Sequence, residues 1–354
     1  MKLNSLIFHP PKVKNEKLEN LIYIPKKELI RKSFKIKKLK KGNSLLSLCS
    51  KSATKFHTSH KLQETLQTTS SYEEITHGHI PALFLKPPIH PPCHQKPSPS
   101  ECSDPYSEKP TLSEPTPTPN THKELLLLYY HSNGESLSTI HPLLKALSIC
   151  LHITILAPEY PSYSVYHTSY KPKSKSKSKD RRHIIIQDIK YILQFIKEVL
   201  GISLNNVLVF GRSLGSWPAL NLALNGRAIG GLVLFGAFTS LKDVARNVVG
   251  NAAVKIFKDG MRNLDLIGKV SCPLLILHGG RDRFVPLAMA QELWEKSKKN
   301  GRFVVLRGCG HNDFHFFKDI LRNLYEFISN IPGDGNVEPI QLPDVYRKKP
   351  IIQK

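Results

Sequence analysis

Three residues in the second half of the chain are of the types that together perform nucleophilic catalysis: Ser213, Asp282 and His311. A serine hydroxyl attacks a carbonyl carbon efficiently when a histidine takes its proton and a carboxylate orients that histidine. The chemistry open to this set is therefore acyl transfer followed by hydrolysis. Singly, each has a simpler interpretation, with Ser213 as an exposed turn residue, Asp282 as a helix cap and His311 as part of a turn. Their places relative to the predicted strands decide between these interpretations.

Ser213 stands in the sequence Gly-Arg-Ser-Leu-Gly, residues 211–215. The apolar run 207–210 before it predicts a strand buried on both faces, and 216–224 after it predicts a helix. Gly-x-Ser-x-Gly at a strand-to-helix turn is the nucleophile elbow, in which the serine is strained and the residues two positions away must be small. We therefore predict that Ser213 is the nucleophile, held at the carboxyl edge of a sheet beside a helix N-terminus that stabilises negative charge.

Asp282 and His311 each follow a predicted strand directly. Because the carboxyl ends of parallel strands lie at one edge of a sheet, we expect both side chains to share that edge with Ser213. Asp265 and Asp313 are the competing carboxylates. Asp313 is so close to His311 in sequence that we expect it to accept a local hydrogen bond instead of orienting the imidazole.

An oxyanion hole needs two backbone amides, one from the residue after the nucleophile and one from a loop after an earlier strand. Leu214 supplies the first amide. The loop 131–134 supplies the second, with the amide of Asn133 favoured and that of Ser132 as the alternative. His131, in the same loop, is interpreted as a structural histidine rather than as a second base.

A sheet must bring these residues together, and the pattern from residue 124 onward predicts one. Short apolar runs rich in β-formers alternate with segments of helical period, which indicates parallel strands. The predicted fold class is α/β, with a mostly parallel central sheet, helices on both faces and room for only a short cap between residues 235 and 269. The predicted strands are 80–85, 125–130, 153–157, 207–210, 231–235, 273–278 and 303–306, and the predicted helices are 143–148, 184–199, 216–224, 241–249, 288–298 and 316–328.

One domain, residues 79–330, is predicted to hold this whole pattern. Two segments within it are expected to be insertions that do not pack, the proline-rich stretch 86–122 and the basic loop 167–182. Residues 331–354 are predicted to be a C-terminal tail. The proline-rich stretch holds three residues of metal-ligand types whose spacing matches no recognised metal site, so we expect no metal and no cofactor. These residues are His90, Cys93 and His94.

The formal charge of +23 is concentrated outside the predicted sheet. Residues 1–62 hold 16 Lys and Arg against 3 Asp and Glu, a net +13, and residues 171–182 hold 7 against one, a net +6. We expect 1–78 to be a basic, largely disordered region in which 21–24 and 33–41 are the candidate strands. It is interpreted as a solvated arm or as a contact for an anionic membrane surface, and its few aromatic residues argue against nucleic acid. We expect a monomer.

The six cysteines show no paired spacing, which favours a reducing compartment. Cys150, Cys272 and Cys309 adjoin predicted strands and are expected to be buried thiols. The sequence shows no signal-peptide pattern and no run of membrane-spanning length, and Lys2 excludes N-myristoylation. The predicted localisation is cytoplasmic, with peripheral attachment to the cytoplasmic face of membranes as the extension that the basic region suggests.

Five short motifs surround the predicted site: His-Ser-Asn at 131–133, Glu-Tyr-Pro-Ser-Tyr at 159–163, Gly-Arg-Ser-Leu-Gly at 211–215, His-Gly-Gly-Arg-Asp at 278–282 and Gly-Cys-Gly-His-Asn-Asp at 308–313. With the order Ser, Asp, His they resemble the α/β-hydrolase-fold serine hydrolases, and within these the α/β-hydrolase domain-containing protein 17 subfamily. The resemblance covers 80–86 and 124–330. It implies the α/β-hydrolase fold, a triad of Ser213, Asp282 and His311, and hydrolysis of the palmitoyl thioester on membrane-bound proteins.

The chain departs from the pattern of this subfamily in two places. Glycine is usual where Ser132, Ser162 and Ser164 stand, a change that would reshape the oxyanion loop. The relatives carry an N-terminal cluster of lipidated cysteines, whereas only Cys49 lies in that region here. The basic region would then have to take the place of an acyl anchor, and one weak signal gives marginal membrane binding.

The sequence thus predicts a serine hydrolase of acyl thioesters or esters, acting on an acylated protein or a lipid-like ester, with protein depalmitoylation as the leading hypothesis. A short cap favours a substrate presented on a bulky carrier. Two alternatives remain. One is a carboxylesterase, lipase or serine aminopeptidase-like hydrolase on the same fold, and the other is a catalytically inactive protein that interacts with a membrane surface.

Overall fold

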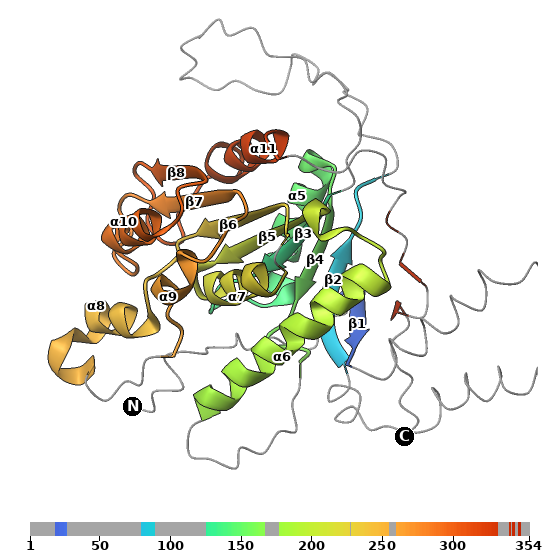
Figure 1. Ribbon diagram of the computed structural model, residues 1–354, viewed down its shortest axis with the longest axis horizontal. Coiled ribbons are helices and arrows are strands. Elements are labelled where there is room, and N and C mark those ends of the chain that lie inside the picture. Colours follow the sequence, from blue (N-terminus) through green and yellow to red (C-terminus); the bar gives the residue numbers. More distant parts are fainter. Residues whose placement is uncertain are drawn as a thin grey trace, which may run out of the picture.

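The computed structural model describes residues 18–26, 79–88, 125–166, 177–226, 228–254, 260–331, 340, 342–343 and 346–347. These residues form one eight-stranded sheet with helices on both faces (Figure 1). The strands are β1 (Leu21–Pro25), β2 (His79–Leu85), β3 (Leu126–Tyr130), β4 (Thr154–Pro158), β5 (Val207–Arg212), β6 (Gly231–Phe235), β7 (Leu274–Gly279) and β8 (Gly301–Leu306). Every predicted strand is confirmed, with its ends shifted by two residues or fewer.

The sheet is mostly parallel, as predicted. Its strand order is β1-β2-β4-β3-β5-β6-β7-β8, and all pairs from β4 to β8 are parallel. Among the described strands β2 alone runs opposite to the others, since it pairs antiparallel with both β1 and β4. The carboxyl ends of the parallel strands therefore meet at one edge.

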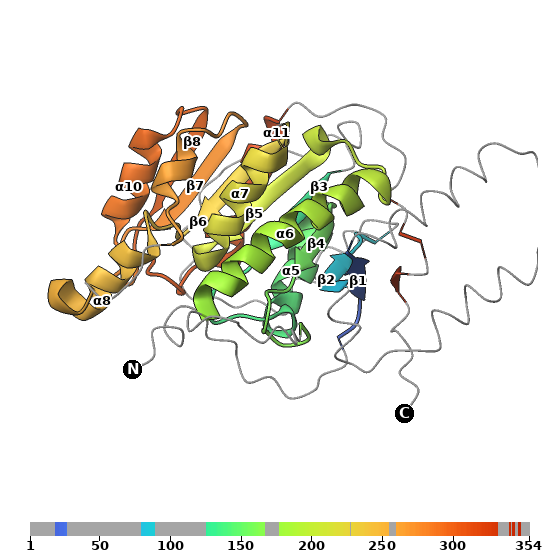
Figure 2. The ribbon, with the colours of Figure 1, turned by 60° about the horizontal axis from the view of Figure 1, so that its bottom comes forward.

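The helices divide between the two faces of the sheet. The apolar side chains of α6, α7, α9 and α10 pack on one face, and those of α5 and α11 pack on the other. Figure 2 shows α6 and α7 on the near side of the sheet and α5 behind it. The helices are α5 (Leu137–Leu151), α6 (Lys177–Glu198), α7 (Ser216–Gly226), α8 (Leu241–Val254), α9 (Leu264–Ile267), α10 (Leu287–Lys296) and α11 (Arg322–Ser329), with short turns η2 (Leu204–Asn206), η3 (Ser213–Gly215) and η4 (Phe316–Leu321).

Helix α5 begins six residues before the predicted start at residue 143. Ser136 caps it through a capping box with Thr139, whose hydroxyl accepts a hydrogen bond from the Ser136 amide at 2.8 Å. Pro142 lies inside the helix, which is why the sequence favoured a later start.

The strand order reverses at β3 and β5, which are neighbours although β4 comes between them in sequence. The chain leaves β3 through α5 on one face and returns to β5 through α6 on the other. The register pairs Tyr130 with Gly211, so the loops after β3 and β5 begin side by side. In open α/β sheets, ligands bind outside the carboxyl ends at such a switch point.

The first strand corrects the predicted domain start at residue 79. β1 lies in the region 1–78, which was expected to be largely disordered, yet it pairs with β2 along its whole length. Its Ile22 and Ile24 side chains are buried in the core. The candidate strand 21–24 is thereby confirmed, and the candidate 33–41 lies outside the described residues.

Two further boundaries are also wrong. Tyr346, in the predicted tail 331–354, is buried, and its ring packs edge-on against Phe195 of α6 with 5.3 Å between centroids. Helix α6 begins at Lys177, inside the predicted basic loop 167–182. The rest of that loop and the proline-rich insertion from residue 89 to residue 122 lie outside the described residues.

The expectation of buried thiols is wrong for Cys150, which is exposed, and Cys272 and Cys309 are only partly buried. Among the described residues no group of three His, Cys, Asp or Glu side chains is placed to hold a metal ion, and the predicted non-site at His90, Cys93 and His94 lies outside them. No helix in the described part of the chain combines the length and apolar character needed to cross a membrane.

A buried ion pair fixes the end of β1 to α6. Lys26 Nζ lies 2.9 Å from Asp188 Oδ1, and the Tyr166 hydroxyl donates to Asp188 Oδ2 at 2.8 Å. Burial raises the pKa of the Asp188 carboxyl, while the Lys26 charge and the two hydrogen bonds oppose that rise. Removal of either partner would leave a buried group without its counter-charge.

We predict that Lys26→Ala lowers the free energy of unfolding by about 3 kcal/mol, because it leaves the Asp188 carboxylate buried and unpaired. Urea denaturation measures the change. Lys299→Ala is the control, since it breaks an exposed pair with Glu295 and is expected to cost less than about 0.5 kcal/mol. Equal losses in the two variants would show that β1 is not held in this way, whereas recovery in a Lys26→Met, Asp188→Asn double variant would support it.

Candidate active site

The turn after β5 has the geometry predicted for a nucleophile elbow. Ser213 has φ +49°, a left-handed conformation that costs a non-glycine residue about 1–2 kcal/mol. A Cβ at Gly211 would lie 2.5 Å from the Gly215 carbonyl oxygen, and a Cβ at Gly215 would lie 2.1 Å from the Tyr130 carbonyl oxygen. Both distances are too short for any side chain, so the requirement for small residues on either side of Ser213 is confirmed.

The structure brings Ser213, Asp282 and His311 together at the carboxyl edge of the sheet. Ser213 Oγ lies 3.0 Å from His311 Nε2, and His311 Nδ1 lies 2.6 Å from Asp282 Oδ2. The three residues come from the loops after β5, β7 and β8, although as many as 98 positions separate them in sequence. The spatial arrangement that their order predicted is therefore present.

Asp282 is held as an acceptor for the imidazole. Its Oδ1 accepts hydrogen bonds from the Phe284 amide at 2.9 Å and the Val285 amide at 2.8 Å, which leaves Oδ2 for His311. Burial alone would raise the pKa of the Asp282 carboxyl, but the hydrogen bond and charge of His311, together with the Val285 amide, bring that pKa below its usual value. An ionised Asp282 fixes the ring so that Nε2 faces Ser213.

The loops that carry Asp282 and His311 are joined by backbone hydrogen bonds. The Gly280 amide donates to the Leu306 carbonyl at 2.9 Å, and the Arg281 amide donates to the Cys309 carbonyl at 2.8 Å. These bonds continue the pairing of β7 with β8 beyond the ends of the strands. The aspartate and the histidine are thus positioned by the sheet itself.

The two competing carboxylates have other partners. Asp313 accepts a hydrogen bond from the Gly310 amide at 2.6 Å, which confirms the prediction of a local acceptor role. Asp265 is exposed and pairs with Arg262 at 2.6 Å. Asp282 alone among the three is bonded to His311 in the described part of the chain.

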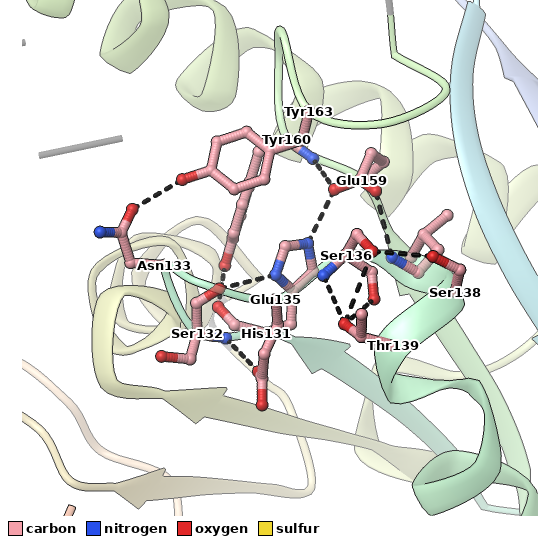
Figure 3. Close-up of polar contacts among 11 residues, drawn as sticks. His131, Ser132, Asn133, Glu135, Ser136, Ser138, Thr139, Glu159, Tyr160 and Tyr163 are labelled. Atoms are coloured by element: carbon pink, nitrogen blue, oxygen red, sulfur yellow. Dashed lines mark hydrogen bonds and ion pairs between the residues drawn. The ribbon is translucent and has the colours of Figure 1, made fainter. Parts of the chain in front are cut away.

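The loop after β3 holds both amides that the sequence analysis considered for the oxyanion hole, and the choice of Asn133 stays a prediction. The Ser132 amide, the alternative, donates to Glu135 Oε2 at 2.7 Å and is thereby engaged (Figure 3). The side chain of Asn133 is fixed by the Tyr163 hydroxyl, which donates to Asn133 Oδ1 at 2.7 Å. Leu214 begins the turn directly after the nucleophile, within η3.

Arg212 is a residue of the site that sequence reasoning missed. It is buried beside the nucleophile, donates to Glu135 Oε1, and donates to Asn312 Oδ1 at 2.9 Å. Its guanidinium carbon lies 4.8 Å from the ring centroid of Phe314, and burial lowers the pKa of the group. Arg212 therefore connects the elbow to the oxyanion loop and to the histidine loop. The sequence signal that could have identified Arg212 was a cationic residue at the end of an otherwise apolar strand.

The loop after β4 shows why glycine is usual at two of its positions. Ser162 and Ser164 have φ +70° and +33°, in the region where glycine is favoured. The chain accepts this strain next to Tyr163, whose ring is fully buried. The prediction that these serines reshape the oxyanion loop stays a prediction.

Three curated relatives are α/β-hydrolase domain-containing proteins. Protein 17B from Homo sapiens is 26% identical over 203 residues, which make up 57% of this chain and 66% of the relative. Protein 17C from Mus musculus is 24% identical over 58% of this chain and 59% of the relative, and aho-3 from Caenorhabditis elegans is 24% identical over 60% and 59%. The chain has the α/β-hydrolase fold. The predicted resemblance to the protein 17 subfamily is confirmed, and the matched part spans about 60% of the length of most of these relatives.

Two solved structures also match this chain, with TM-scores below 0.5. An esterase from Pyrococcus furiosus is 17% identical, with a TM-score of 0.49, over 60% of this chain and 84% of the esterase. A monoacylglycerol lipase from Paleococcus ferrophilus is 19% identical, with a TM-score of 0.42, over 58% and 94%. No protein-family model matches the chain.

We predict that Gly215→Ala destabilises the fold by about 1–3 kcal/mol and displaces the elbow, because its methyl group would overlap the Tyr130 carbonyl. Thermal unfolding and reaction of Ser213 with a fluorophosphonate probe measure the two effects. Gly134→Ala is the matched control for the change in stability, since Gly134 is exposed and a Cβ there meets nothing within 4 Å. A folded Gly215→Ala variant that reacts at the wild-type rate would contradict the prediction.

Proposed function

We propose that this chain is a serine hydrolase of acyl thioesters or esters, and that the palmitoyl thioester of an acylated protein is its substrate. The observation that carries the proposal is the pair of contacts from Ser213 Oγ to His311 Nε2 at 3.0 Å and from His311 Nδ1 to Asp282 Oδ2 at 2.6 Å. Similarity to the protein 17 subfamily supports the choice of substrate.

In the proposed mechanism, Ser213 Oγ attacks the acyl carbonyl carbon while His311 Nε2 takes the hydroxyl proton. The oxygen of the tetrahedral intermediate accepts hydrogen bonds from the amides of Asn133 and Leu214. Collapse expels the thiol or alcohol, which leaves with the proton from His311, and an acyl-Ser213 ester remains. Water then attacks this ester, with His311 as base, and releases the acid and free Ser213.

Apolar side chains beside the triad support an apolar acyl group. Phe284 is 48% exposed, and its ring centroid lies 5.1 Å from that of His311. Val248 of α8 is 49% exposed, and the neighbouring Asn247 side chain donates to the carbonyls of Arg283 and Phe284. An acyl chain bound to Ser213 has exposed hydrocarbon surface within reach, and burial of such surface is favourable.

We predict that Ser213→Ala abolishes labelling by a fluorophosphonate probe, because that probe reacts with an activated serine hydroxyl. Ser203→Ala is the matched control, since Ser203 is exposed and its side chain makes no capping hydrogen bond. Gel fluorescence with the purified chain measures both. Labelling that survives in Ser213→Ala would overturn the assignment, and a folded wild type that resists the probe would favour the inactive interaction protein.

The substrate class is tested by turnover of a palmitoyl-thioester peptide, short p-nitrophenyl esters and aminoacyl amides by the purified chain. We expect the highest kcat/KM for the palmitoyl thioester, since long acyl chains bury more apolar surface than short ones. We also expect Asp282→Asn to lower kcat by about 10⁴-fold on the preferred substrate. A preference for short esters would indicate a carboxylesterase, and a preference for amides would indicate a serine aminopeptidase-like hydrolase.

A further inference from the structure

The imidazole of His131 lies buried behind the loop that carries the predicted oxyanion amide. None of its surface is exposed, and its ring packs against Tyr160 and Tyr163, with centroids 4.3 Å and 5.8 Å away (Figure 3). Both tyrosines belong to the loop after β4, whereas His131 directly follows β3. The ring therefore lies at the junction of two loops, with no access for a substrate.

Both ring nitrogens of His131 face hydrogen-bond acceptors. Nδ1 lies 2.9 Å from the Ser132 carbonyl oxygen, and Nε2 lies 2.8 Å from Glu159 Oε1. A carbonyl oxygen accepts only, and a carboxylate accepts in its ionised form. The ring is therefore held from both sides, by the Ser132 carbonyl at one nitrogen and by the Glu159 carboxyl group at the other.

The Glu159 carboxylate is itself held by backbone donors. Oε1 accepts from the Tyr160 amide at 2.9 Å, and Oε2 accepts from the Leu137 amide at 3.2 Å. Leu137 is the first residue of α5, where the helix dipole favours a negative charge. Because two backbone amides fix the carboxylate, Glu159 in turn fixes the position of the His131 ring.

His131 determines which way the amide of Asn133 points. The Ser132 carbonyl and the Asn133 N–H belong to one planar trans peptide unit, so they point in opposite directions. When Nδ1 of His131 holds the Ser132 carbonyl, the Asn133 N–H is directed away from the buried ring. The His131 carbonyl is held as well, by the Tyr160 hydroxyl at 2.7 Å.

The same stretch of backbone lies against the elbow. A Cβ at Gly215 would be 2.1 Å from the Tyr130 carbonyl oxygen and 2.9 Å from the His131 carbonyl oxygen. The peptide unit between Ser132 and Asn133, which His131 orients, therefore directly follows backbone that packs against the turn that holds Ser213. A rotation of that unit would change the distance between the amide and the reacting carbonyl oxygen.

We propose that the buried His131–Glu159 pair is a positioning device that aims the Asn133 amide into the oxyanion hole through the Ser132 carbonyl. The inference rests on the proposed function, because it assigns the pair a role in stabilising the tetrahedral intermediate. His131 touches no reacting atom and acts only through the peptide unit that it holds.

Two variants test the two ring nitrogens of His131 one at a time, because each keeps a hydrogen-bond donor at only one of the two positions. The amide nitrogen of Gln in His131→Gln lies near the place of Nε2, so this variant keeps a donor for Glu159 and loses the donor for the Ser132 carbonyl. The amide nitrogen of Asn in His131→Asn lies near the place of Nδ1, so this variant keeps the donor for the Ser132 carbonyl. Glu159→Gln is added to the second variant because a buried carboxylate without a partner would destabilise it.

The measurements are kcat, KM and the inhibition constant of a boronic acid, which adds to the serine as a tetrahedral mimic, on the full chain. We expect His131→Gln to lose about 10–100-fold in kcat and to bind the boronic acid more weakly by a similar factor, with KM within about 2-fold of wild type. We expect His131→Asn, Glu159→Gln to stay within about 5-fold of wild type in kcat. Ile196→Ala removes a buried side chain near the end of α6, at the edge of the sheet where β5 begins, so it controls for loss of stability and is expected to keep its kcat.

Wild-type kcat in a folded His131→Gln variant would overturn the inference, as would losses of kcat that merely follow the loss of stability across the three variants. A rise in KM with kcat unchanged would also overturn it, since an amide that acts on the intermediate changes kcat. Failure of the proposed function shows separately, in the wild type, as an absence of reaction with both the fluorophosphonate and the boronic acid.

Discussion

The contact between two backbones, at Gly215 and Tyr130, is the constraint on which the rest of the site depends. It is so close that a single methyl group at position 215 would lie 2.1 Å from the Tyr130 carbonyl oxygen. The contact exists because β3 and β5 are adjacent at the point where the strand order reverses. It places the strained Ser213 and the loop that begins at His131 against one another. The strain at Ser213 persists because packing on both sides of the turn leaves it no other conformation.

Buried charges then organise the loops around this contact. Arg212 bonds to Glu135 and to Asn312, and Glu159 bonds to His131 and to the start of α5. A buried charge without a partner is strongly destabilising, so each pair permits few arrangements of the loops that carry it. Ion pairs of this kind add little net stability but favour one geometry over its competitors. Here they link the loops after β3, β4, β5 and β8, which carry or adjoin the residues of the proposed reaction.

The features of the fold and the site that could be predicted from the sequence are those that local residue patterns encode. Apolar runs of four to six residues predicted the parallel strands, and the motif at residues 211–215 predicted the strained conformation of Ser213. Arg212 and Glu159 were missed as members of the site, because their side chains bond to residues far away in sequence and such contacts leave no local pattern. β1 was only a candidate because its five residues stand alone among basic residues, far in sequence from the strand that they pair with. Tyr346 was assigned to a tail because the sequence does not show that its ring reaches Phe195.

The pairing of β1 with β2 also bears on how this chain can change in evolution. Pro25 and His79 are opposite one another in the register, so β1 ends and β2 begins at the same place in the sheet. The entropy of closing such a loop grows only with the logarithm of its length, and a tenfold difference in length changes it by about 2 kcal/mol. Insertions, deletions and wholesale replacement of that stretch are therefore tolerated by the folded core. Because β1 runs in the same direction as β4, that place lies at the carboxyl edge of the sheet, so lineages can diversify there on the same edge as the proposed site.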